Sequence, residues 1–145
     1  MRIYIFAVTL ALVLGASLAP AADASSSQAA FHSDEDEATL LAVRMYADWC
    51  GYCEALDNKL DQEVRPGLTD ASIVFIYFDM TDQDTQRHTR MYASYLGLEE
   101  VFDRHQGQTG YMVLVDPESG EELDRITSDV SPSAMHETLV RAASN

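Results

Sequence analysis

Cysteine and basic side chains are both scarce in this sequence. Only two cysteines are present, Cys50 and Cys53. A disulfide between them would close a loop over two intervening residues and constrain little chain entropy, so a purely structural role is poorly supported. Nine basic residues stand against 24 acidic ones, a formal net charge of −15. Nucleic acid and anionic membrane surfaces are therefore poor partners. A basic protein partner fits the charge, but a solvated acidic surface is the simpler explanation.

A long apolar run occurs only near the N-terminus. Residues 3–18 are almost entirely apolar, follow Met1-Arg2 and precede Ala19-Pro20-Ala21, a small-residue cleavage pattern. The run is shorter than the roughly 20 residues that span a bilayer. The sequence thus predicts a signal peptide over 1–21, a flexible lead-in over 22–33 and one folded domain over 34–145. The mature protein would be periplasmic or otherwise extracytoplasmic, with no membrane span; an uncleaved membrane anchor is the competing interpretation.

The two cysteines lie between an apolar run over 40–46 and a helical pattern, within Trp49-Cys50-Gly51-Tyr52-Cys53. A strand followed by a helix places the first sulfur at a helix N-terminus, where unpaired N–H groups and the helix dipole stabilise a thiolate. The second sulfur follows one turn later, near enough to close a disulfide. The pattern therefore predicts thiol–disulfide exchange by Cys50 and Cys53.

The remaining patterns predict an α/β domain. A short helix from Asp34 precedes strands over 40–46, 72–78, 111–115 and 122–126 and helices over 50–65, 84–96 and 99–105, and a last helix begins at Pro132. Right-handed crossovers make the first two strands parallel, and a tight turn makes the last two antiparallel. The expected result is a mixed four-stranded sheet with helices on both faces. In the helix over 84–96 the large apolar residues cluster on one side: Met91, Tyr92, Tyr95 and Leu96.

The segment Val43-Arg44-Met45-Tyr46-Ala47-Asp48-Trp49-Cys50-Gly51-Tyr52-Cys53, with this element order, resembles the thioredoxin superfamily over residues 34–145. The resemblance implies a thioredoxin-like fold in which Cys50 attacks a substrate disulfide and Cys53 resolves the mixed disulfide. Trp49 would shield the site and help to hold a partner. The dipeptide Gly51-Tyr52 is similar to that of bacterial periplasmic disulfide isomerases and would tune the redox potential. The residues that precede it are more similar to thioredoxins and membrane-reductase domains.

Three positions depart from that family pattern. Arg44 stands where thioredoxins usually have a buried acid, and a guanidinium cannot serve as a general base. It would instead favour a nearby thiolate or pair with an acid such as Asp79. Gly110, after Thr109, stands where the family has a cis-proline that faces the cysteines. A cis bond without proline costs about 2.5–4 kcal/mol, so we expect a trans loop and altered substrate binding there. Glu54 replaces a frequent lysine and opposes thiolate formation.

The combined prediction is an exported thiol–disulfide oxidoreductase that reduces disulfides of exported partner proteins and draws electrons from a redox donor. It would be a monomer without metal, organic cofactor or nucleic acid. An isomerase usually needs a dimerisation domain, for which the chain has no room, so a reductase is preferred over a disulfide oxidase or isomerase. A non-catalytic docking module and a metal-handling module are competing hypotheses. The metal-handling module would combine the cysteines with one or more of the histidines His32, His88, His105 and His136.

Overall fold

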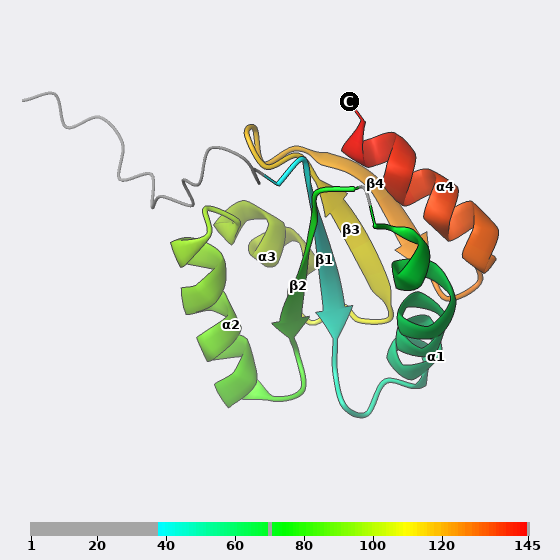
Figure 1. Ribbon diagram of the computed structural model, residues 1–145. Helices are drawn as coiled ribbons and strands as arrows, with labels where there is room; N and C mark the ends of the chain where they lie inside the picture. Colours follow the sequence, from blue (N-terminus) through cyan, green and yellow to red (C-terminus); the bar gives the residue numbers. More distant parts are fainter. Residues whose placement is uncertain (1–37, 70, 145) are drawn as a thin grey trace, which may run out of the picture.

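The structure, a computed structural model, describes residues 38–69 and 71–144 (Figure 1). The predicted signal peptide over 1–21, the lead-in over 22–33 and the short helix from Asp34 lie outside these residues. No helix in the described residues has the length and apolar character needed to cross a membrane.

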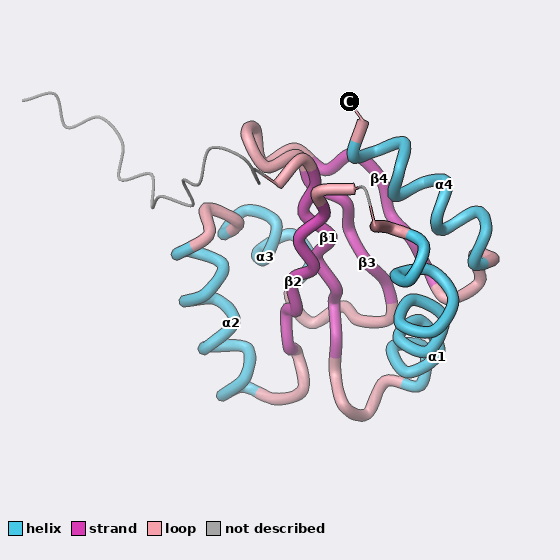
Figure 2. Tube along the Cα trace, in the orientation of Figure 1, coloured by secondary structure: helices cyan, strands magenta, loops and turns pink. Residues whose placement is uncertain are grey.

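Four strands form one mixed sheet in the order β2-β1-β3-β4 (Figure 2). The strands are β1 (Leu40–Tyr46), β2 (Ile73–Asp79), β3 (Tyr111–Val115) and β4 (Glu122–Thr127). Strand β1 pairs in parallel with β2 and antiparallel with β3, and β3 pairs antiparallel with β4. The most apolar strands, β1 and β3, are central and are covered on both faces, whereas β2 and β4 form the edges.

Helices cover both faces of this sheet. Helix α1 (Gly51–Lys59) and helix α4 (Pro132–Ala143) lie on one face, and α2 (Gln83–Tyr95) and α3 (Glu99–His105) lie on the other (Figure 1). A π-helical turn over Leu60–Val64 and a 3-10 turn over Arg65–Gly67 continue α1. Capping side chains begin α2 and α4, since Asp82 accepts from the N–H of Thr85 and Ser131 accepts from the N–H of Ala134.

Two apolar cores follow from the alternation of side chains along β1 and β3. One lies under α1 and α4 and contains Leu56, Leu60, Met112, Leu114, Met135 and Leu139 among others. The other lies under α2 and α3 and contains Val43, Met45, Phe78, Phe102 and Val113 among others. The predicted mixed four-stranded α/β fold with helices on both faces is confirmed.

Helix α2 turns three of the four clustered apolar side chains toward solvent, whereas Leu96 at its C-cap packs against the core. Its buried positions are Thr89 and Ala93, whereas Met91, Tyr92 and Tyr95 are exposed. Thr89 is retained in the interior because its hydroxyl donates to the carbonyl of Asp79 and accepts from the N–H of the same residue. This satisfied hydroxyl and the small Ala93 let the helix approach the sheet closely.

Candidate active site

Cys50 is the N-cap of α1, at the carboxyl end of β1. Its backbone is extended, and its Sγ accepts a hydrogen bond from the N–H of Cys53, with a distance of 3.2 Å. An N–H group and the positive end of the helix dipole therefore point at this sulfur. The Cys50 side chain retains slight exposure, so a partner disulfide can approach it from solvent. These features favour a thiolate at Cys50 in the reduced protein.

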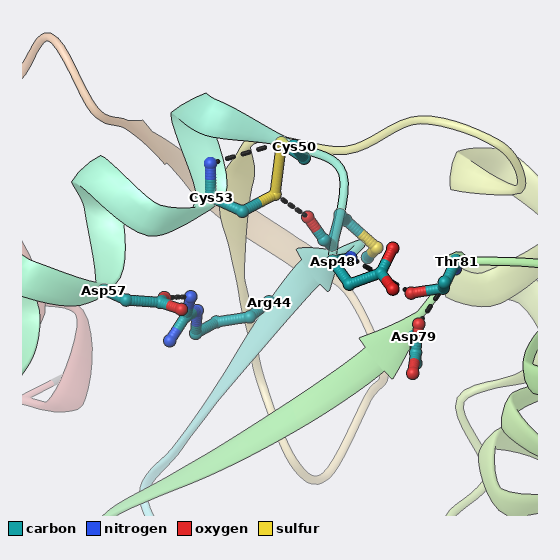
Figure 3. The surroundings of a disulfide bond; sticks show 8 residues. Arg44, Asp48, Cys50, Cys53, Asp57, Asp79 and Thr81 are labelled. Carbon is teal, nitrogen blue, oxygen red and sulfur yellow. Dashed lines mark hydrogen bonds and ion pairs between the residues drawn. A yellow bond between two sulfur atoms is a disulfide. The ribbon is translucent and has the colours of Figure 1, made fainter.

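Cys53 is joined to Cys50 in a disulfide, with 5.3 Å between the two Cα atoms (Figure 3). It lies on the buried face of α1 with 1% of its surface exposed, and its Sγ is 3.6 Å from the carbonyl oxygen of Met45. The second sulfur is thus shielded from an external disulfide but remains within bonding distance of the first. The two sulfurs therefore differ in their access to solvent.

Two aromatic side chains, Trp49 and Tyr52, lie close to Cys50 in the sequence and near its sulfur. Trp49 is 64% exposed, and its Nε1 donates to the carbonyl oxygen of Thr81 over 2.9 Å. The same threonine accepts from the N–H of Asp48 and donates its own N–H to Asp79 (Figure 3). The β2–α2 connection therefore fixes the loop before the cysteines. Sequence reasoning missed Thr81, because only the sheet topology brings it beside the motif.

Gly110 faces the cysteines from the loop before β3. A Cβ at this position would lie 3.1 Å from the Cβ of Tyr52 and 3.7 Å from the Sγ of Cys50. Its φ of +94° also disfavours any residue with a side chain. Its N–H donates to the carbonyl of Met45, and no peptide bond among the described residues is cis. Glycine therefore lets a trans loop approach the disulfide closely, and partly buried Thr109 precedes it.

Arg44 lies in β1 with only 1% of its surface exposed and reaches toward α1 (Figure 3). It forms an ion pair with Asp57, and its Nη1 donates to the hydroxyl of Tyr77 over 2.7 Å. Burial lowers the pKa of the guanidinium by removing it from water. The suggested partner Asp79 is wrong: register places Tyr77 beside Arg44, and Asp79 binds the Thr81 N–H. A sequence signal for Asp57 did exist, because helical spacing places it one turn after Cys53.

A cleft of about 190 Å³ opens beside Cys50. Cys50 and the carboxylates Asp48, Glu54 and Asp57 are among its lining residues. A larger cavity of about 410 Å³ is lined by residues of the 67–72 connection, α4 and Thr39. It is lined by His136 but by neither cysteine, so the smaller cleft is the one through which a partner can reach Cys50.

The three histidines within the described residues do not gather around the cysteines. His105 contacts Tyr111 and Glu122, His136 contacts the carbonyl of Gly67, and His88 lies on the outer part of α2. His32 lies outside the described residues. Within 38–69 and 71–144 no three His, Cys, Asp or Glu side chains are grouped to hold a metal ion.

Comparison with protein-family models and with curated sequences found no match. Several solved structures are similar. A protein from Edwardsiella tarda termed Trxlp has 20% identity and a TM-score of 0.46, over 72% of this chain and 84% of that one. A putative protein disulfide isomerase from Bacteroides thetaiotaomicron has 16% identity and a TM-score of 0.48, over 74% and 75%. Mitochondrial thioredoxin 3 from Saccharomyces cerevisiae has 17% identity and a TM-score of 0.41, over 73% and 81%.

The fold assignment does not depend on these similarities. The sheet order β2-β1-β3-β4, the parallel pairing of β1 with β2 and the antiparallel β3 and β4 match the architecture expected from the sequence. The Cys-Gly-Tyr-Cys pair begins the helix that follows β1, as that expectation required. The described domain therefore has a thioredoxin-like fold with a disulfide-forming Cys50–Cys53 pair at the N-terminus of α1.

Proposed function

We propose that the protein is an exported thiol–disulfide oxidoreductase that reduces disulfides of partner proteins. The observation that supports this most directly is the asymmetry of the pair. Cys50 Sγ accepts a hydrogen bond from the N–H of Cys53 at the start of α1, and Cys50 keeps 9% of its surface exposed, whereas Cys53 keeps 1%. An attacking sulfur needs a stabilised thiolate and access, and a resolving sulfur needs only proximity.

The reaction proceeds by two displacements. The Cys50 thiolate attacks one sulfur of the substrate disulfide, forms a mixed disulfide and releases the other substrate sulfur as a thiolate. The Cys53 thiolate then attacks Cys50 Sγ, forms the Cys50–Cys53 disulfide and releases the second substrate sulfur. Two electrons pass to the substrate, and its two thiolates take up the protons that the dithiol has lost. A separate dithiol donor must then return two electrons to the protein.

The residues around the pair support contact with a protein substrate. Trp49 and Tyr52, which are 64% and 70% exposed, present apolar surface beside a sulfur that is itself nearly buried. Gly110 leaves the loop opposite them without a side chain. Because Asp48 and Glu54 are exposed nearby, a basic segment around the target cysteine suits this surface better than an acidic one.

Export and the reducing direction rest on sequence features. The apolar run over 3–18 with its Ala-x-Ala pattern supports export, and the similarity of the residues before the cysteines to thioredoxins supports a reductase. Exported thiol proteins are then the proposed substrates. A redox donor in the same compartment completes the cycle.

Single cysteine variants test the mechanism. Cys50→Ser should abolish reduction of a protein disulfide, whereas Cys53→Ser should accumulate mixed disulfides that survive acid quenching and are released by dithiothreitol. A Cys53→Ser protein with normal turnover would contradict the two-cysteine mechanism.

The reduction potential of the pair tests the direction. It is measured by thiol trapping in glutathione buffers, and a value near about −270 mV is expected for a reductase. A value between about −180 and −120 mV would show an oxidase or isomerase instead.

A further inference from the structure

We propose that Asp57 is a positioning residue of the redox pair: it neutralises the buried Arg44 and thereby keeps the Cys50–Cys53 dithiol reducing. The inference rests on the proposed exchange activity and concerns how its equilibrium is set. It assigns a role to a side chain that has no place in the two displacements themselves.

Arg44 places a fixed positive charge on the face of the sheet that is covered by α1, the helix that carries the disulfide. Arg44 immediately precedes Met45, whose carbonyl oxygen is 3.6 Å from Cys53 Sγ, and its side chain points to the α1 face of the sheet. Asp57 lies one helical turn after Cys53 on α1 and forms the ion pair with this guanidinium. The pair therefore connects the strand that ends at the site with the helix that begins at it.

Asp57 is the only carboxylate among the described residues that forms an ion pair with Arg44. The other polar contact of the guanidinium is the neutral hydroxyl of Tyr77, and its buried Nε has no hydrogen-bond partner in the described part of the chain. Asp61, one turn further along, raises the pKa of the Arg44 guanidinium through its charge and Arg65 lowers it, but these two residues form their own ion pair with each other at the surface. The Asp57 side chain is 25% exposed and lines the same cleft as Cys50. Asp57 therefore faces both the cation and the cleft, and one of its two carboxylate oxygens is buried.

The remaining ionisable groups near the pair are less able to perform this role. They come from β1, from the loop before α1, from α1 and from the end of β2: Tyr46, Asp48, Tyr52, Glu54 and Asp79. Asp48 and Glu54 are exposed, so solvent and salt screen their charges. Asp79 is directed at the N–H of Thr81. Arg44 and Asp57 are therefore the charges whose removal should act on the sulfurs in a low-dielectric setting.

The direction in which each variant shifts the reduction potential follows from the charge that it removes. A cation near a thiol favours its thiolate, and a stabilised thiolate stabilises the reduced protein, which makes the disulfide a stronger oxidant. With Asp57 present, the field of Arg44 is largely cancelled and the pair stays reducing. Loss of Asp57 alone should uncover the cation, and loss of Arg44 alone should uncover the carboxylate.

The test is the equilibrium with glutathione for four variants, together with the pH profile of Cys50 alkylation. Asp57→Asn should shift the equilibrium about tenfold toward the reduced form, about 30 mV for two electrons, and lower the alkylation midpoint. Arg44→Met should shift it in the opposite direction by about threefold, because the partly exposed carboxylate is better screened. The double variant should lie within about twofold of the unaltered protein. Asp84→Asn removes an exposed carboxylate that pairs with Arg87 and should leave the equilibrium unchanged.

Opposite shifts exclude a merely structural role, which would lower stability without a sign change. If Asp57→Asn does not fold, the double variant is compared with Arg44→Met. The glutathione equilibrium of the double variant should then lie about threefold further toward the reduced form than that of Arg44→Met. Equal potentials in that comparison, or shifts of the same sign for Asp57→Asn and Arg44→Met, would overturn the proposal. An unaltered protein that fails to exchange with glutathione would overturn the proposed function instead, so the two failures are distinguishable.

Discussion

Two side chains that can carry a positive charge are buried within the described residues, one under α1 and one in α3 on the opposite face of the sheet. Arg44 and His105 are 1% and 2% exposed. Each is paired with one carboxylate and one tyrosine hydroxyl, from Asp57 and Tyr77 in the first case and from Glu122 and Tyr111 in the second. The arrangements are alike, yet their positions relative to the redox pair differ.

Arg44 contacts α1, the helix that carries the sulfurs, whereas His105 supports the loop opposite them. The imidazole lies 2.8 Å from the hydroxyl of Tyr111, the residue after Gly110, and that hydroxyl also donates to Gln108. The Arg44 pair thus sets charge at the dithiol, and the His105 cluster sets the shape of the facing loop. A buried ion pair beside a reactive centre can act on its chemistry, whereas a similar cluster one residue from a substrate loop acts through geometry.

The largest effect should come from Asp57→Asn, which leaves a buried guanidinium without its carboxylate. The free energy of unfolding should fall by about 3 kcal/mol, the lower end of the range for breaking a buried pair, because Asp57 is partly exposed. Arg44→Met should cost about 1 kcal/mol or less, since the remaining carboxylate can be hydrated. Urea denaturation of both variants measures the difference. Equal losses of unfolding free energy would show that leaving Arg44 unpaired costs no more than leaving Asp57 unpaired.

His105→Phe should cost about 1–2 kcal/mol, because Glu122 and Tyr111 lose a buried partner but keep Arg104 and Gln108 respectively. The glutathione equilibrium should stay within about twofold of the unaltered protein, in contrast to Asp57→Asn. Urea denaturation and thiol trapping on the same samples provide both values. A tenfold shift in the glutathione equilibrium would mean that His105, like the Arg44–Asp57 pair, acts on the charge at the redox pair and not only on the shape of the facing loop.

Alkaline pH should lower the stability of the domain through Tyr111, the tyrosine that contacts His105. Burial raises the pKa of Tyr111 above its ordinary value of 10.0, so the folded state keeps a proton that the unfolded state loses. This contribution is complete below pH 10.0 and is lost as pH rises through the folded-state pKa. Stability of Tyr111→Phe should therefore fall less steeply above about pH 10 than that of the unaltered protein, as measured by urea denaturation at several pH values. Parallel slopes would contradict a role for this phenol.

The same comparison separates what the sequence could predict from what it could not. Strands β1 and β3 are continuous apolar runs, and the order of elements allows few topologies, so the sheet and its helical layers were predictable. The burial of Cys53, Leu56 and Leu60 along α1 and its continuation followed from helical spacing. These features depend on short-range pattern and on rules of connection.

Features that depend on long-range packing were not predictable. The apolar cluster of α2 at Met91, Tyr92 and Tyr95 faces solvent, because spacing identifies a helix but not which side the sheet covers. Arg44 could be paired with any acid within reach until the register placed Tyr77 beside it and α1 brought Asp57 over it. The position of Gly110 against Tyr52 likewise depends on how the loop closes over the helix.

The smallest effect should come from an exposed Arg–Asp pair, which serves as the reference for the buried one. Arg87 and Asp84 on α2 are 2.8 Å apart, with side chains 66% and 75% exposed. Exposed pairs contribute about 0–1 kcal/mol, since water and salt screen the charges and two flexible side chains must be ordered. Asp84→Asn should therefore change the free energy of unfolding by less than about 0.5 kcal/mol, in urea denaturation alongside Asp57→Asn. A loss as large as that of Asp57→Asn would mean that burial is not what distinguishes the two pairs, and the special role of the Arg44–Asp57 pair would then need another physical basis.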